Sequence, residues 1–124
     1  MQEIDTIVYA GRLKNKMELM NSSSGGAFIA VSDYFLDNNN AVVCAVYDYE
    51  SHATEFHLIE SKEERNKAIG SKFMRSKPGQ VYRTAEKWLK EHSEKKLLFA
   101  ATVLHLISYN VQHMAVLRIV RWII

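Results

Sequence analysis

The chain has 124 residues, of which 48% are hydrophobic and 24% are charged, and its formal net charge is +2. This length suits one domain with a real core but not two, and the composition is that of a soluble globular protein and not of a fibrous or disordered chain. The single cysteine, Cys44, excludes an internal disulfide and a metal site built from several thiolates of this chain. Cys44 lies inside an apolar run, where we expect a small buried residue and not a nucleophile.

Charge is distributed unevenly along the sequence. Residues 1–61 carry 3 Lys and Arg against 9 Asp and Glu, whereas residues 62–96 carry 11 against 5. A basic half beside an acidic half indicates either an anionic ligand or simply solvated helix faces, and the second explanation is the commoner one. Residues 1–5 are acidic and lack the apolar region of a signal peptide, so we expect a cytoplasmic protein.

The first predicted element is a strand at residues 7–11, a short apolar run that ends in glycine. A polar connection, residues 12–21, leads to the segment Ser22-Ser23-Ser24-Gly25-Gly26. Apolar residues then recur at helical spacing, so we predict a helix over residues 27–37 that stops at three asparagines. We expect this helix to bury Ala27, Phe28, Val31, Tyr34 and Phe35.

The serine–glycine segment, residues 22–26, has the features of an anion site. Serine is a good N-cap, because its hydroxyl accepts a hydrogen bond from an unpaired N–H of the first helical turn. Gly25 and Gly26 let a bound group approach the backbone, and the helix dipole favours negative charge there. Two interpretations stay open: a plain helix cap, which is the commoner, and a site for a phosphate or another acid. The segment is not a P-loop, since the Lys-Ser/Thr pair of that motif is absent.

A β-hairpin is predicted next. Residues 41–47 form an apolar run too short for a typical helix, so we expect a buried strand. Residues 48–52 turn the chain, and residues 54–60 alternate as a second strand. The inward residues of that strand should be Phe56 and Leu58. His52 and His57 have no third ligand nearby, so no metal site is expected.

A capping box begins the next helix, with Ser61 as N-cap and Glu64 three residues later. This helix should end at Ile69, with Gly70 as its left-handed cap. Residues 71–77 follow as a basic loop that carries hydroxyls and one aromatic ring.

Pro78 suits the first turn of another helix. The buried residues of that helix should be Val81, Ala85, Trp88 and Leu89. Residues 91–96 form a charged turn, and residues 97–101 are another buried strand. The alternation of strands and helices predicts a single α/β or α+β domain, with a mixed sheet of about four strands covered by helices.

Residues 102–124 do not fit this plan. Their apolar residues fit the spacing of a helix and of a strand equally, and no helix caps are present. Polar residues interrupt the apolar run, so it makes a poor transmembrane helix and we expect no integral membrane span. We therefore divide the chain into a domain at residues 1–101 and a divergent apolar tail at residues 102–124. Exposed strand edges and this tail favour self-association.

Three blocks of the sequence, taken in order, resemble a known family. They are Asn21-Ser22-Ser23-Ser24-Gly25-Gly26-Ala27-Phe28, Gly70-Ser71-Lys72-Phe73 and Leu97-Leu98-Phe99-Ala100. Their order and spacing are similar to the N-terminal domain of the coenzyme F-420 hydrogenase/dehydrogenase beta-subunit family. The resemblance covers about residues 7–101, and the ordered set is fairly specific although each block alone is weak.

The resemblance implies a flavin and iron–sulfur oxidoreductase subunit, which moves electrons between clusters, a bound FAD and a deazaflavin or another acceptor. Its partners would be the flavin and a redox partner subunit or ferredoxin-like domain, and relatives also occur in bacterial polysaccharide biosynthesis clusters. Carried over block by block, the resemblance places the flavin against Ser22, Ser23, Ser24, Gly25, Gly26, Ser71 and Lys72. A helix start and a lysine both suit a diphosphate, and the redox chemistry would belong to the cofactors.

The chain departs from the family pattern at Ala101. The family normally continues there with Gly-Thr-Pro-Cys-Gln and a long cysteine-bearing portion, whereas this chain has Ala101-Thr102-Val103-Leu104-His105. The cysteines that would hold an iron–sulfur cluster are absent from it, since thiolates are the usual ligands. A frameshift or truncation produces such an abrupt loss of resemblance. We therefore expect an out-of-frame tail and a chain that, alone, binds flavin weakly and is inactive.

A different class of function stays open. In a non-catalytic binding or assembly domain, linked to polysaccharide biosynthesis by the same resemblance, the basic half between residues 62 and 96 would contact an acidic protein partner. That association would weaken with salt and show no flavin spectrum. Nucleic acid is not an expected partner, because Phe73 is the only aromatic residue of the basic loop and the sequence contains no known nucleic-acid-binding motif.

Overall fold

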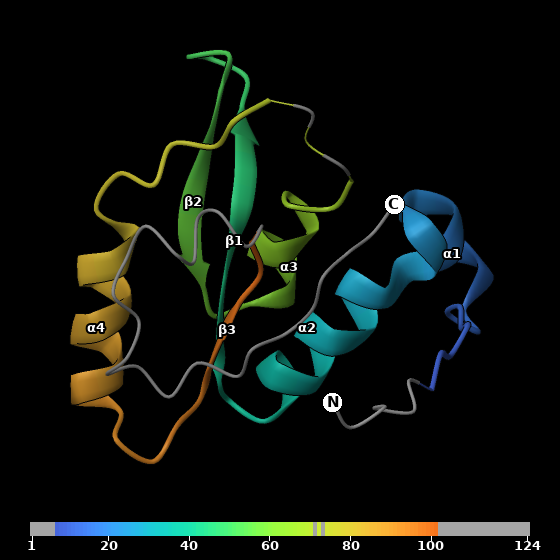
Figure 1. Cartoon of the computed structure of the whole chain (residues 1–124), viewed down its shortest axis with the longest axis horizontal. Helices are drawn as coiled ribbons and strands as arrows, with labels where there is room; N and C mark the ends of the chain where they lie inside the picture. The colour runs from blue at the N-terminus through green and yellow to red at the C-terminus, as the bar shows by residue number, and fades with distance from the viewer. Residues whose placement is uncertain (1–6, 71, 73, 102–124) are drawn as a thin grey trace, which may run out of the picture.

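The computed structural model describes residues 7–70, 72 and 74–101. In this part of the chain a three-stranded mixed sheet carries helices on both faces (Figure 1). The elements in chain order are α1 (Lys16–Asn21), the 3₁₀ turn η1 (Ser24–Gly26), α2 (Ala27–Asp37), β1 (Ala41–Asp48), β2 (Ala53–Ile59), α3 (Lys62–Asn66), α4 (Val81–Glu91) and β3 (Leu97–Phe99). The predicted single domain of mixed α and β structure is confirmed as an α+β domain, with three strands instead of about four. The predicted tail, residues 102–124, lies outside the described residues.

The central strand of the sheet is β1. It pairs antiparallel with β2, where Val43 lies opposite Leu58, and parallel with β3, where Val42 lies opposite Leu98. Side chains of successive strand residues point to opposite faces. Since helices cover both faces, the first four residues of β1 are all buried, which explains why this strand is a continuous apolar run and not an alternating one. The predicted hairpin is confirmed.

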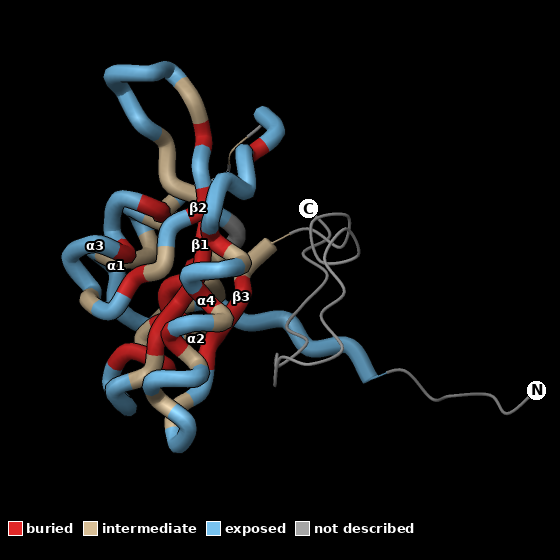
Figure 2. Tube along the Cα trace, turned by 90° about the vertical axis from the view of Figure 1, so that its left-hand side faces the viewer, coloured by how far each residue is buried: buried red, intermediate tan, exposed pale blue. Residues whose placement is uncertain are grey.

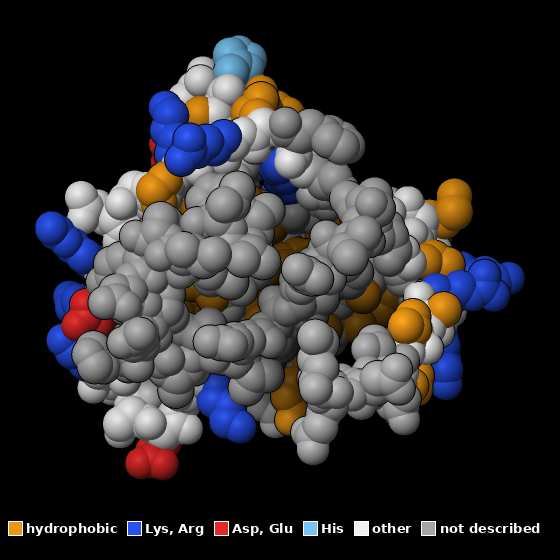
Figure 3. Space-filling view, in the orientation of Figure 1, with side chains coloured by type: hydrophobic (Ala, Val, Ile, Leu, Met, Phe, Trp, Pro, Cys, Tyr) orange, Lys and Arg blue, Asp and Glu red, His pale blue; other side chains and the backbone are white. Residues whose placement is uncertain are grey.

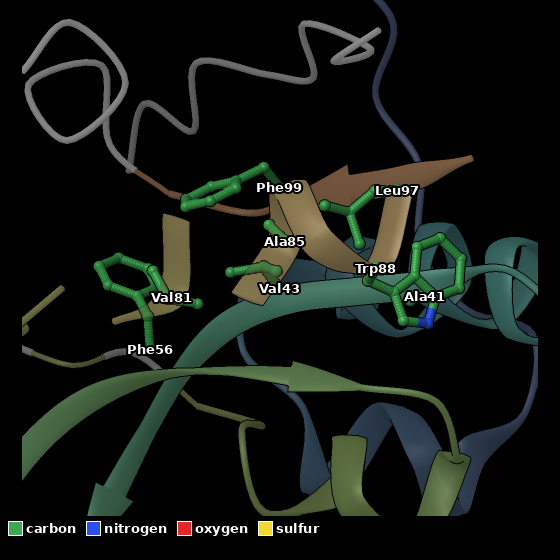
Figure 4. Close-up of a cluster of buried hydrophobic side chains, with 8 residues drawn as sticks. All are labelled: Ala41, Val43, Phe56, Val81, Ala85, Trp88, Leu97 and Phe99. Carbon is green, nitrogen blue, oxygen red and sulfur yellow. The ribbon is translucent and has the colours of Figure 1, made fainter. Parts of the chain in front are cut away.

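The two faces of the sheet form two cores. The core beneath α4 consists of Ala41, Val43, Phe56, Val81, Ala85, Trp88, Leu97 and Phe99 (Figure 4). The core beneath α2 and α3 consists of Phe35, Leu36, Val42, Cys44, Ile59, Ala68 and Leu98. Buried positions follow the sheet, whereas the hairpin tip and the segment before α1 are exposed (Figure 2).

The predicted stripe of α4 is confirmed, because Val81, Ala85 and Trp88 are buried and Leu89 packs against the same core. The range predicted for α2 is also confirmed, but its buried stripe is partly wrong. The buried residues of α2 are Ile29, Ser32, Phe35 and Leu36, and Tyr34 is 69% exposed. The buried face is shifted because a polar residue, Ser32, faces α3. A hydrophobic pattern does not count such a residue as core.

The predicted strand at residues 7–11 is wrong. These residues form no regular structure, and Ile7, Val8 and Tyr9 are 73%, 84% and 86% exposed. A strand needs a neighbour to pair its backbone groups, and none of the strands in the described part pairs with this run. The predicted connection after it contains the short helix α1, whose first N–H groups are capped by the Asn15 side chain.

Two predicted helix boundaries are also wrong. The capping box is confirmed, since Ser61 Oγ accepts from the Glu64 N–H, but α3 ends at Asn66 and not at Ile69. The residues after Asn66 form hydrogen bonds of the 3₁₀ type, from residue i to residue i−3, such as that from the Ile69 N–H to the Asn66 carbonyl. The helix α4 begins at Val81, so Pro78 precedes it and accepts from the Val81 N–H.

Candidate functional site

The serine–glycine segment lies where α1 meets α2 (Figure 1). Ser22 ends α1, because both its N–H and its hydroxyl donate to the Leu19 carbonyl, at 3.2 and 2.8 Å. Ser23 is exposed and makes no side-chain cap. Ser24 begins η1, and its side chain lies outside the described part of the structure. The N-cap of α2 is Gly26, so the predicted serine cap is wrong.

The two glycines have a structural role of their own. Gly25 and Gly26 have φ values of +75° and +78°, a conformation that side chains rarely adopt. A Cβ on Gly26 would lie 2.3 Å from Leu13 Cδ1, and one on Gly25 would lie 2.9 Å from the Gly11 carbonyl oxygen. The pair therefore lets the chain before α1 pack against the start of α2.

The start of α2 nevertheless keeps the features of an anion site. Gly26 supplies no side chain, so no side-chain cap bonds to the N–H groups of the first turn, and that turn contains no acidic residue. The positive end of the dipole of this 11-residue helix points here. A negatively charged oxygen at this position would meet N–H groups that no side chain caps and the exposed Ser23 hydroxyl.

Arg65 links α3 to this helix start. Its side chain is 3% exposed, and its Nη1 donates to the Ile29 carbonyl at 3.2 Å and to Ser32 Oγ at 2.9 Å. Its Nη2 lies 2.7 Å from Asp33 Oδ1. A buried cation thus lies against the first two turns of α2. Sequence patterns did not indicate Arg65, because a short helix of charged residues is normally a solvated one.

Lys72 lies in the segment that follows α3. Its ammonium group donates to the carbonyls of Ala68, Gly70 and Ile69 at 2.7, 3.0 and 3.2 Å. These contacts use all three of its N–H donors. Lys72 is half-buried, and this burial lowers its pKa. It therefore contributes charge to its surroundings but no free hydrogen-bond donor. Ser71, predicted to lie beside the flavin, is outside the described residues.

The two predicted halves of the site share one side of the sheet. Phe28, Val31 and Phe35 of α2 and Ala68, in the segment after α3, belong to or pack against the core that also contains Val42 and Cys44. No hydrogen bond or ion pair between described residues joins residues 22–26 directly to Lys72. Arg65 contacts α2 at Ile29, Ser32 and Asp33, and Lys72 contacts the carbonyls of residues 68–70.

Cys44 is buried on this side of the sheet, as predicted. Burial raises the pKa of its thiol to about 12, against the opposing effect of the Lys72 and Arg65 charges. The thiol therefore stays protonated at neutral pH. His57 is exposed on β2, and His52 lies in the hairpin turn with its Nδ1 3.3 Å from the Tyr47 hydroxyl. Among residues 7–70, 72 and 74–101, no three His, Cys, Asp or Glu side chains form a group that could hold a metal ion.

A scan against models of protein families gives no match to this chain, and neither does a search of curated proteins. In the described ranges no helix is long and apolar enough to cross a membrane. The fold and the site together define a small α+β domain in which Gly26 caps the start of α2 and a buried arginine, Arg65, contacts the first two turns of that helix.

Proposed function

We propose that this chain is the N-terminal, FAD-binding part of a cytoplasmic oxidoreductase subunit of the coenzyme F-420 hydrogenase/dehydrogenase beta-subunit type. The observation that carries the proposal is the start of α2, which has left-handed glycines, no side-chain cap and no acid in its first turn. FAD would supply the electron-transfer chemistry, to or from a deazaflavin or another acceptor. The residues do not fit an iron–sulfur cluster, because the one cysteine is buried and protonated.

Each residue of the site has a defined task in this proposal. The backbone N–H groups at the start of α2 and the Ser23 hydroxyl would donate to the diphosphate oxygens. Arg65 would add positive charge only, because its Nη1 and Nη2 contact α2 and its Nε is buried. Lys72 likewise contributes charge and not hydrogen bonds. The chain's own groups thus provide binding and orientation.

The test is a fluorescence titration of the full chain with FAD, which also detects weak binding. Ser23→Asp places a carboxylate beside the proposed diphosphate and should weaken FAD binding at least tenfold by charge repulsion. The same change should leave the fold intact, because an acid near a helix start is stabilising. Ser93→Asp is the matched control, since Ser93 is exposed in the turn between α4 and β3. Equal FAD affinity of the two variants, or no binding by the unmodified chain, would count against the proposal.

The family assignment makes a separate prediction about the gene. After the codon for Leu97, another reading frame should encode Gly-Thr-Pro-Cys-Gln and a cysteine-rich stretch. A chain repaired in that frame should bind FAD more tightly than this one. Absence of such a frame would favour a domain that binds without redox turnover.

The second candidate is a non-catalytic domain that binds an acidic protein partner. Its support is a row of exposed cations on the segment from α3 to α4, namely Lys67, Arg75 and Lys77. Association of this kind should weaken between low and physiological salt, because exposed charges are screened. It should also be unaffected by Ser23→Asp, which separates it from the flavin proposal.

A further inference from the structure

An open cavity lies away from the start of α2, between the β1–β2 hairpin and the segment that joins α3 to α4. Its volume is about 460 Å³, and its walls include Tyr47, Tyr49, Thr54, Lys67, Lys72 and Met74. Figure 3 shows basic and apolar side chains next to one another in the upper part of the molecule, where Figure 1 places this hairpin. A volume of this size is within the range of small-molecule sites.

One wall of the cavity is aromatic. The rings of Tyr47 and Tyr49 meet edge to face, with centroids 4.9 Å apart. Tyr49 is 81% exposed and Met74 is 48% exposed. Large apolar groups left open beside a cavity offer a flat surface on which a planar ring can stack.

The opposite wall is cationic. It carries Lys67 and Lys72, and none of the described residues that line the cavity is acidic. The donors of Lys72 are bound to backbone carbonyls, so this side chain supplies charge alone. Lys67 is exposed and, within the described part of the chain, makes no ion pair or hydrogen bond through its side chain. Its ammonium group can therefore donate to an anion.

Thr54, which also lines the cavity, has a buried hydroxyl without a hydrogen-bond partner in the described part of the chain. Its side chain is 1% exposed, and its Oγ1 has no hydrogen-bond partner among the described residues. A buried hydroxyl without a partner is costly, so a ligand atom that bonds to it would recover that energy.

We propose that this cavity binds a phosphorylated aromatic compound of the nucleoside monophosphate class. The phosphate would lie at Lys67, the ring on Tyr49, and a polar atom of the ligand near Thr54 Oγ1. This site goes beyond the flavin proposal, because it uses none of residues 22–26 and shares with it only the charge of Lys72.

The test is calorimetric titration of the full chain with AMP, adenosine and inorganic phosphate. AMP should bind most tightly, since it alone offers both ring and phosphate. Lys67→Met should weaken AMP binding roughly tenfold, the effect of one lost charge-assisted hydrogen bond. Lys87→Met is the matched control, because Lys87 lies on α4, outside the cavity, and is 77% exposed.

Two further variants complete the test. Thr54→Val keeps the shape of the side chain and should weaken AMP binding severalfold, with the fold checked by circular dichroism. Ser23→Asp should leave AMP binding unchanged, so failure of the flavin proposal and failure of this one are distinguishable. The proposal is overturned if AMP binds no more tightly than adenosine and phosphate, or if Lys67→Met and Lys87→Met bind it equally.

Discussion

The buried guanidinium of Arg65 is the contact whose removal should matter most for the stability of this domain. Arg65→Met keeps much of the side-chain volume but removes three contacts to α2: those with the Ile29 carbonyl, Ser32 Oγ and Asp33 Oδ1. Breaking one partner of a buried ion pair costs about 3–5 kcal/mol. We expect the lower end, about 3 kcal/mol, because Asp33 keeps 25% exposure and Lys62 Nζ stays 3.7 Å from its Oδ2.

Urea unfolding followed by circular dichroism measures this change. A loss of 3 kcal/mol lowers the midpoint by roughly 2–3 M for a domain of this size. Lys62→Met is the matched control, since it removes a positive charge that lies 3.7 Å from Asp33 and 2.8 Å from Asp37, but Lys62 is 44% exposed. Exposed pairs contribute little, so the midpoint of this variant should barely move. A double-mutant cycle with Asp33→Asn should give a coupling of at least about 1 kcal/mol to Arg65.

Equal urea midpoints for Arg65→Met and Lys62→Met would refute this role of Arg65. That result would mean that the guanidinium contributes no more than a surface charge. A small coupling to Asp33, together with a large single effect, would assign the stability instead to the two neutral acceptors on α2.

Other changes test the fold at single positions. Thr54→Val removes a buried hydroxyl without a partner and should raise the free energy of unfolding by about 1 kcal/mol; a fall of that size in thermal melts would contradict this. Gly26→Ala should cost about 2 kcal/mol, because its Cβ meets Leu13, whereas Gly79→Ala, with φ +52° and open space around it, should cost only about 1 kcal/mol. The Cys44 thiol should resist alkylation at pH 8 until the chain is unfolded. Since its pKa is about 12 when folded and 9.0 otherwise, the folded state holds the extra proton, and stability relative to Cys44→Ala should fall as pH rises from 9 to 12.

Local patterns predicted most of the elements. The run at residues 41–47 and the alternation after it predicted the hairpin, because strand pairing across a short turn is a local event. The stripe of α4 was predicted because each of its buried residues faces an apolar partner. The capping box at Ser61 was predicted because it involves residues only three positions apart.

The candidate site was predicted in outline but not in its contacts. The helix start after Gly26 is where the sequence placed it, yet a glycine and not a serine caps it. Lys72 was expected to bind a ligand directly, and the structure shows its donors bound to the carbonyls of residues 68–70. Neither the role of Lys72 nor the cavity beside Tyr49 could be read from spacing, because both depend on how the chain returns to the sheet after α3.

The sequence by itself thus determined the class of the domain, its hairpin, its two long helices and a glycine-led helix start, since these depend on periodicity and on neighbours a few residues apart. Only the tertiary structure decided that residues 7–11 form no strand, that Arg65 is buried against Ser32 and Asp33, and that Thr54 lies beneath a cavity. The physical reason is that burial of a polar group and pairing of a strand are favourable only when a distant segment supplies the partner. No local pattern contains that partner.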